Sequence, residues 1–195
     1  MRLHTRARDI APDVMQARLF IILPFILVLT GCVHRIEVNP VPSGPASTTI
    51  PRSLQLIAGP LALEGPDHMP GITLLNWAHR DLSQALLRYA QQRDTFGSVS
   101  TDPADLTLRI TTKLSMASRD RYRYRIRLQS DMSETGQLIK TYLVEQDAMG
   151  SWARWTTASD RDPIEAALQL ALDDLFAQIE GDRALYVGGK GQPAR

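Results

Sequence analysis

The feature that most constrains the fold is a period-two alternation of apolar and polar side chains over residues 105–132. Even-numbered positions are mostly apolar and odd-numbered positions polar, first over Asp105–Met116 and again from Tyr122 onward. Successive side chains of a strand point to opposite faces, so each stretch is predicted to be a strand with one buried face. Ala117–Asp120 is the turn between them, which favours an antiparallel hairpin. After a second turn, Gln137–Met149 is predicted as the third strand of a meander.

Two segments with helical periodicity flank this meander. Residues 73–93 carry apolar side chains at steps of three and four, which places them on one face of a helix. Asp162–Glu180 repeats the pattern, with its first residue at the N-cap and Pro163 at the first helical position. With Leu54–Leu63 as a first strand, the order is strand, helix, three strands, helix. We predict an α+β domain: a mixed, mostly antiparallel sheet of about four strands with both helices on one face.

Residues 1–31 are typical of a secretory signal peptide. Residues 1–18 contain four arginines and two aspartates, and Leu19–Leu29 is an apolar run without charge. As a helix that run would span about 16 Å, which is too short for a hydrocarbon core of about 30 Å. A basic stretch, a short apolar core and a small-residue cleavage site together indicate secretion.

The end of the run, Leu29-Thr30-Gly31-Cys32, resembles a bacterial lipobox. The resemblance implies that residues 1–31 are removed and that Cys32 receives a diacylglyceryl group and an N-acyl chain. Several acyl chains make a lasting anchor, whereas one would not. The alternatives are an ordinary signal peptide with an incidental cysteine, or an uncleaved anchor. Enterobacterial lipoproteins held at the inner membrane usually carry an aspartate after the lipidated cysteine, so the resemblance, with Val33 at that position, implies the periplasmic face of the outer membrane over inner-membrane retention.

The remaining chain divides into three regions. Residues 32–52 are the lipidated cysteine with a tether, which four prolines are expected to keep extended. The alternative is that Ile36–Val41 packs along the domain as an edge strand. Residues 53–182 are the periplasmic domain, and residues 183–195 are a glycine-rich flexible tail. Without residues 1–31 the chain keeps 18 of its 22 basic and 19 of its 21 acidic side chains, so its net charge is −1.

No motif of an enzyme is present in the sequence. The four histidines have no metal-site spacing, and there is no HExxH, nucleophile elbow or phosphate loop. Cys32 is the sole cysteine, which excludes an intramolecular disulfide and a multi-cysteine metal site. Asp173 and Asp174 are expected on the solvated side of the last helix. We therefore expect no catalytic residue, no metal and no cofactor beyond the lipid on Cys32. The near-neutral charge argues against a nucleic-acid partner.

The most unusual feature is a row of basic residues at period two. The basic residues expected on the uncovered sheet face are Arg109, Lys113, Arg119, Arg121, Arg123, Arg125 and Arg127. One interpretation is a solvated face with Glu145 or Asp147 as cross-strand partners. The other is a docking face for an acidic protein, an anionic polysaccharide or lipid headgroups. Trp152 and Trp155 follow the last strand, either as core residues or as an aromatic contact for a neighbouring subunit or the membrane interface.

With these elements in place, the mature domain resembles the TolB amino-terminal-domain-like group of periplasmic lipoproteins, which includes the curli-export and Pel-export lipoproteins and an activator of penicillin-binding proteins. The resemblance follows the pattern of Leu54–Leu63, Leu82–Arg93, Phe96–Val99, Ala104–Met116, Tyr122–Gly136 and Asp162–Glu180. It implies a non-catalytic subunit of an outer-membrane export or assembly system, with envelope protein partners and a homo-oligomer as an open option. The alternatives are a tethered regulator of a periplasmic cell-wall enzyme, or a binder of anionic glycan or lipid.

Overall fold

The computed structural model describes residues 32–65, 73–154 and 156–187. The predicted signal peptide, Trp155 and the last part of the predicted tail, 188–195, lie outside the described residues. From Val33 onward the chain forms one compact unit. No helix within the described ranges has the length and apolar character needed to cross a membrane.

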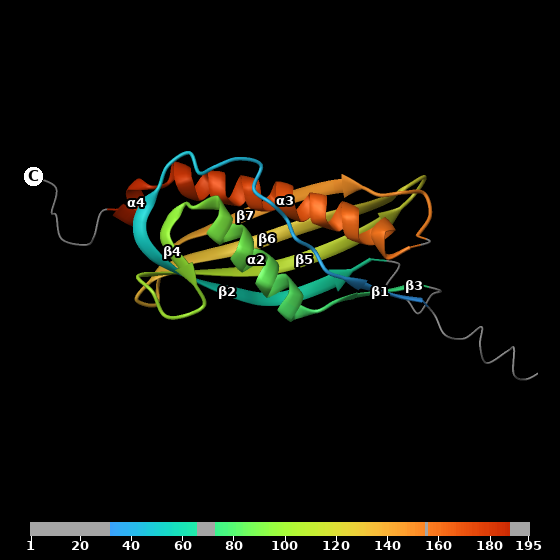
Figure 1. Cartoon of the computed structure of the whole chain (residues 1–195), viewed down its shortest axis with the longest axis horizontal. Helices are drawn as coiled ribbons and strands as arrows, with labels where there is room; N and C mark the ends of the chain where they lie inside the picture. The colour runs from blue at the N-terminus through green and yellow to red at the C-terminus, as the bar shows by residue number, and fades with distance from the viewer. Residues whose placement is uncertain (1–31, 66–72, 155, 188–195) are drawn as a thin grey trace, which may run out of the picture. The chain divides into compact units, whose positions relative to one another are not determined.

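A five-stranded mixed sheet with the strand order β4-β2-β5-β6-β7 forms the centre of this unit (Figure 1). β2 (Ile50–Glu64) lies between β4 (Phe96–Ser100) and β5 (Leu106–Ser118) and runs parallel to both. β5, β6 (Tyr122–Glu134) and β7 (Gln137–Met149) form the predicted antiparallel meander. The predicted α+β class is confirmed. The sheet has one strand more than expected, because β4 is too short to show an alternation.

The register of β5 and β6 places their even-numbered residues on the inner face of the sheet. Leu108 lies opposite Met132 and Leu114 opposite Ile126, and all four side chains are buried. Their odd-numbered neighbours lie on the other face. The period-two pattern of the sequence is therefore the pattern of burial in these strands.

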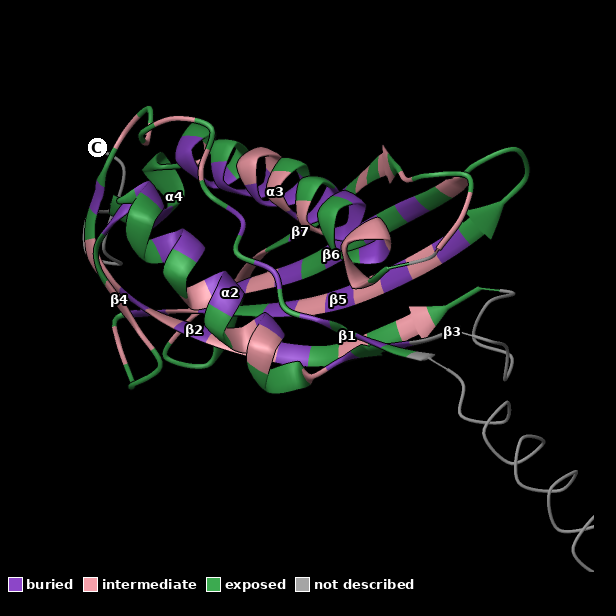
Figure 2. Ribbon diagram, turned by 45° about the vertical axis from the view of Figure 1, so that its right-hand side comes forward, coloured by how far each residue is buried: buried purple, intermediate pink, exposed green. Residues whose placement is uncertain are grey.

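Two helices, α2 (His79–Arg93) and α3 (Thr157–Gly181), cover the inner face (Figures 1 and 2). α2 packs against β2 and β4, and α3 packs against β6 and β7. The two helices meet where the rings of Tyr89 and Phe176 lie 5.5 Å apart. No described helix covers the outer face of the sheet, which agrees with the predicted open face.

The predicted helix over 73–93 is wrong in its first part. Residues Thr73–Trp77 form strand β3, which pairs with β1 (Cys32–Ile36) in a separate two-stranded sheet. Leu75 and Trp77 are buried and Asn76 between them is exposed. This short alternation is hidden in the sequence, because Leu75 also continues the helical spacing of the following residues.

The last helix also begins earlier than predicted. Its N-cap is Thr156, whose hydroxyl oxygen accepts a hydrogen bond from the backbone N–H of Ser159, and Pro163 lies inside the helix. Asp162 is therefore not the N-cap. Pro163 has no N–H to donate to the preceding turn, so the helix tolerates the loss of one internal hydrogen bond. The additional turn brings Asp160 into the protein interior.

The predicted tether and tail are partly folded, which corrects both predictions. Side chains of residues 33–40 alternate between exposed and buried, with Ile36 and Val38 in the core. The chain then crosses the helices in an extended form until β2 begins at Ile50 (Figure 2). At the other terminus, α4 (Ala184–Val187) buries Tyr186 completely. Proline suits an extended segment, and here the segment gains contacts that a free tether would lack.

Candidate functional site

The outer face of the sheet carries the strand members of the predicted basic row. The charged residues that alternate outward from β5, β6 and β7 are Arg109, Lys113, Arg123, Arg125, Arg127, Asp131, Glu145 and Asp147. Register places Arg125 opposite Asp147 and Arg127 opposite Glu145. The face therefore has mixed charge, and arginines of β6 lie opposite carboxylates of β7.

Ion pairs cross from β6 to β7 over this face. The Arg127 Nε lies 2.7 Å from Glu145 Oε2, and the Arg125 Nη1 lies 3.3 Å from Glu145 Oε1. Arg123 is 3.4 Å from Asp147. These are the partners expected for a solvated face. All five side chains are between 34% and 51% exposed, so water and salt screen the pairs and each contributes less than about 1 kcal/mol.

Arg119 and Arg121 do not belong to the strand row. Both lie in the β5–β6 turn, before β6 begins at Tyr122, and both are exposed. Neither forms an ion pair with another described residue, in contrast to Arg123. The period-two spacing continues through the turn in sequence, but the backbone does not continue as a strand there.

A hollow of about 700 Å³ lies beside this turn. Its lining residues are Ser115, Met116, Ala117, Arg119, Asp120, Arg121, Arg123, Arg125 and Met149. Four arginines and a single aspartate give it an excess of positive charge. The hollow is thus the place where the predicted basic residues gather without full neutralisation by β7.

Trp152 lies next to the same turn and is 74% exposed. Its loop is fixed to the start of β6 by two backbone hydrogen bonds. The Gly150 N–H donates to the Tyr122 carbonyl at 2.8 Å, and the Tyr122 N–H donates to the Ser151 carbonyl at 3.1 Å. Trp152 is therefore not a core residue. Trp155, predicted as its companion, lies outside the described residues.

A buried polar cluster around Asp160 holds the first strand onto the domain. His34 Nδ1 lies 2.6 Å from Asp160 Oδ2, and Arg154 donates to both carboxylate oxygens at 2.7 and 3.0 Å. The Tyr124 hydroxyl donates to Oδ1. Burial alone would raise the pKa of Asp160, but hydrogen bonds from Arg154, Tyr124 and His34 outweigh it and lower that pKa. The carboxylate thus stays charged and fully paired.

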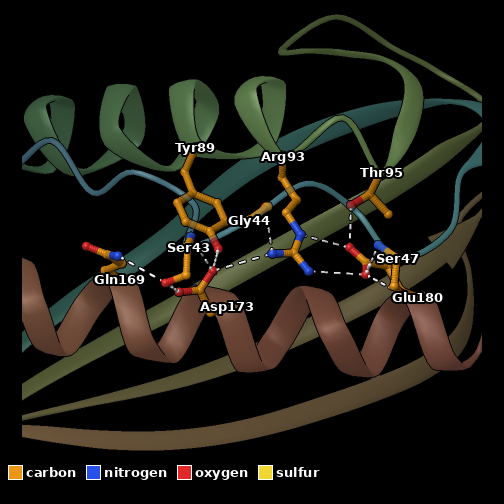
Figure 3. A network of polar contacts seen from close by, with 9 residues as sticks. All are labelled: Ser43, Gly44, Ser47, Tyr89, Arg93, Thr95, Gln169, Asp173 and Glu180. Atoms are coloured by element: carbon orange, nitrogen blue, oxygen red, sulfur yellow. Dashed lines mark hydrogen bonds and ion pairs between the residues drawn. The ribbon is translucent and has the colours of Figure 1, made fainter.

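A second cluster, around Glu180, fixes the extended segment between the helices (Figure 3). Arg93 donates to both oxygens of Glu180 at 2.9 and 3.2 Å. Thr95 adds a hydroxyl donor at 2.9 Å, and Ser47 adds its N–H at 2.9 Å and its hydroxyl at 2.7 Å. Burial opposes the charge of Glu180, yet these hydrogen bonds prevail and lower its pKa to about 2.

Asp173 extends the Glu180 cluster along α3. It accepts a hydrogen bond from the Tyr89 hydroxyl at 2.5 Å and from the Ser43 hydroxyl at 2.6 Å. Asp174 is half-buried and accepts from Gln146. The prediction that both aspartates lie on a solvated helix side is therefore wrong. Their carboxylates accept hydrogen bonds from other elements of this chain.

Apart from Asp173, the residues of these clusters were not singled out by sequence patterns. His34 was assigned to the tether, and Asp160 precedes the predicted helix start. The available signal was the alternation of Ile36 and Val38 with polar neighbours, which indicates a strand that buries every second residue. No three histidine, cysteine, aspartate or glutamate side chains in the described ranges group in a way that could hold a metal ion.

Comparison with known proteins finds a similar fold but no similar sequence. No protein-family model matches the chain, and no curated protein sequence matches it. A Xanthomonas campestris structure with the family description DUF330 has a TM-score of 0.52 at 16% identity, covering 78% of this chain and 98% of that one. This likeness shows a shared fold.

Two further structures are more distant. A minor lipoprotein from Acinetobacter baumannii has a TM-score of 0.34 at 19% identity and covers 68% of this chain and 96% of its own. A PelC dodecamer from Paraburkholderia phytofirmans has a TM-score of 0.33 at 10% identity, with coverages of 65% and 90%. With TM-scores below 0.5, these two matches assign neither a fold nor a subfamily to this chain. The TolB-like resemblance stays a prediction.

Proposed function

We propose that this protein is a non-catalytic, lipid-anchored envelope lipoprotein that serves as an accessory subunit of an outer-membrane export or assembly system. The observation that carries the proposal is the uncovered outer face of the sheet. Three strands of thirteen residues present it, and the two long helices both lie on the opposite face (Figures 1 and 2). A fold of this size that leaves one sheet face open offers a large flat surface to a partner.

The composition of that face favours a protein partner. Its charges alternate in sign between β6 and β7, an arrangement that sets the register and specificity of a complex more than its affinity. Leu143 is 63% exposed among these charges and supplies an apolar contact. β7 is also an edge strand, so its outer backbone groups are available for pairing with another chain.

The packed amino-terminal segment disfavours a long-reach regulator. Such a regulator needs a flexible linker to carry its domain away from the membrane toward a cell-wall enzyme. Here the folded unit starts at Val33, directly after Cys32, and residues 34–47 are bound along α3. A lipid on Cys32 would therefore keep the domain at the bilayer surface.

Site-specific photocrosslinking in intact cells tests the proposal. A photoreactive amino acid at Leu143 on the open face should give discrete higher-mass adducts. The matched control is Leu170 on the solvent side of α3, which is 48% exposed and should give none. Adducts from Leu170 alone, or from neither position, would contradict the assigned face. Adducts of exactly twice the monomer mass would identify the partner as a second copy.

The lipid anchor is tested separately by Cys32→Ser. We expect this variant to accumulate in unprocessed form and the acylated form of the parent protein to partition into detergent. If processing and partitioning of the variant equal those of the parent, the lipoprotein part of the proposal is wrong. The crosslinking result does not depend on this outcome, so the two parts fail independently.

A further inference from the structure

We propose that the end of the domain from which Val33 emerges is a docking surface for anionic lipid headgroups, with Arg119, Arg121 and Trp152 as its contacts. This surface, the Val33 end, comprises the β5–β6 turn, the β7–α3 loop and the start of β1. The inference rests on the proposed lipid anchoring, and it adds the orientation in which the anchored domain meets the bilayer.

Three contacts bring the parts of the Val33 end together. The β7–α3 loop is hydrogen-bonded to Tyr122, the first residue of β6. Two residues along β6, Tyr124 binds Asp160 in the first turn of α3, and Asp160 binds His34 of β1. Figures 1 and 2 show β1 at the same end of the sheet as the ends of β5 and β7.

The hydrogen bond between His34 and Asp160 restricts how far this end can move from a lipid on Cys32. His34 is buried, and only Val33 separates it from Cys32. Two extended residues span about 7 Å. Attachment at Cys32 would therefore hold His34 and the start of β1 within about one Debye length, roughly 8–10 Å, of the point where the chain meets the bilayer.

Charge distinguishes the Val33 end from the opposite end of the sheet. The described β5–β6 connection contains the exposed Arg119, Asp120 and Arg121, whereas the side chain of Arg154 in the β7–α3 connection is buried and paired with Asp160. At the opposite end, the connections α2–β4, β4–β5 and α3–α4 contain Asp94, Asp102, Asp105, Asp182 and Arg183. Anionic headgroups attract the first end and repel the second, which gives the domain a preferred orientation.

Trp152 adds the apolar contact. Exposed aliphatic side chains also occur at the opposite end, where Leu138 and Leu185 are 62% and 49% exposed. Trp152 is the largest exposed apolar side chain among the described residues, and it lies beside the unpaired arginines. Tryptophan favours the boundary between headgroups and hydrocarbon, where one side of the ring is apolar and the N–H stays hydrated.

The test uses the full lipidated protein in lipid nanodiscs of two compositions: phosphatidylcholine alone, or with 30% phosphatidylglycerol. With anionic discs, hydrogen exchange should slow at the backbone amides of 119–121 and 150–153. Brominated lipids should quench a component of the tryptophan fluorescence that is absent from Trp152→Phe. Both effects should weaken in 0.5 M salt, and soluble glycerol phosphate should not reproduce them.

Matched variants assign the effect to the named residues. Arg119→Glu with Arg121→Glu should reduce the protection on anionic discs on the order of ten-fold or more, since each basic residue near such a surface contributes about five-fold. Arg183→Glu at the opposite end is the charge control and should change nothing. Trp152→Ser should also reduce the protection on anionic discs, and Leu185→Ser at the opposite end is its apolar control and should change nothing.

The outcomes separate this inference from the proposed function. Mass spectrometry of the Cys32 peptide shows whether the protein is acylated, and a free thiol there would contradict the anchoring itself. An acylated protein with equal exchange and equal quenching in both discs would overturn the docking surface alone. Protection by soluble polyglutamate in place of anionic discs would assign these arginines to an acidic protein and overturn it too.

Discussion

Two regions of this molecule that contain arginine–carboxylate pairs, the Glu180 cluster and the β6–β7 ladder, differ in burial. The Glu180 cluster lies between the helices, where Glu180 is 3% exposed and every one of its oxygens has a donor. The ladder of Arg123, Arg125 and Arg127 lies on the open face, with each side chain near half exposure. The same chemistry therefore has two uses: buried pairs determine the fold of this chain, and exposed pairs can exchange partners at little cost.

The largest expected effect comes from breaking the buried region. Glu180→Ala leaves the Arg93 guanidinium buried without its main counterion and removes the acceptor of Ser47 and Thr95. Loss of one partner of a buried ion pair costs about 3–5 kcal/mol. Urea unfolding should show a lower free energy of unfolding by that amount. Glu145→Ala on the open face is the matched control, and equal losses in the two variants would contradict the comparison.

Acid should destabilise the same region, and the loss in the free energy of unfolding should be somewhat smaller than that of Glu180→Ala. Folding lowers the pKa of Glu180 from 4.5 to about 2, so the unfolded chain binds more protons between these values. The stabilisation is complete above pH 4.5 and is lost as the pH falls toward 2, a total on the order of 3 kcal/mol. The pKa of Asp160 is also lowered, and it acts in the same direction.

Urea titrations between pH 6 and pH 2 measure this dependence. Glu180→Gln has no proton to bind at this position, so its stability should fall less steeply with acid than that of the parent protein. Parallel slopes for the two proteins would show that Glu180 is not held at a lowered pKa.

A third prediction concerns the amino-terminal strand. His34→Ala removes one hydrogen bond to Asp160 and leaves a small space beside a buried carboxylate. We expect a loss of about 1–3 kcal/mol and faster hydrogen exchange over β1 than over β6. His79→Ala is the control, since His79 is exposed and binds only the Gly59 carbonyl and Ser83. Unchanged exchange in β1 would show that His34 does not hold this strand.

The elements that sequence patterns predicted best are those with long, uninterrupted periods. The meander has thirteen-residue strands, and α3 buries the whole predicted stripe from Ile164 to Ile179. Short elements were missed for the opposite reason. Five residues of β3 or β4 contain too few repeats to separate a strand from the end of a helix or a loop.

Sequence patterns predicted only the part of the candidate site whose residues lie on a single strand. Alternation along β6 placed Arg123, Arg125 and Arg127 on one face, and their acidic partners followed from an adjacent strand. The Asp160 cluster unites residues 126 positions apart, and no local pattern encodes such a contact. A segment rich in proline suggested a free tether, because composition reports backbone preference and not the surface against which the segment packs.

The smallest effect on stability should come from the exposed region, and it sharpens the comparison most. Arg127→Ala removes the shortest contacts of the ladder, the 2.7 Å hydrogen bond and the 2.5 Å ion pair to Glu145. Because both partners are solvated, the free energy of unfolding should change by less than about 1 kcal/mol. If the open face binds a partner, the crosslinking yield from Leu143 should nevertheless fall, whereas Arg88→Ala on α2 should leave it unchanged. A loss of several kcal/mol in Arg127→Ala would show that the ladder stabilises the fold as the buried pairs do. An unchanged crosslinking yield from Leu143 would show that Arg127 is not part of the proposed contact.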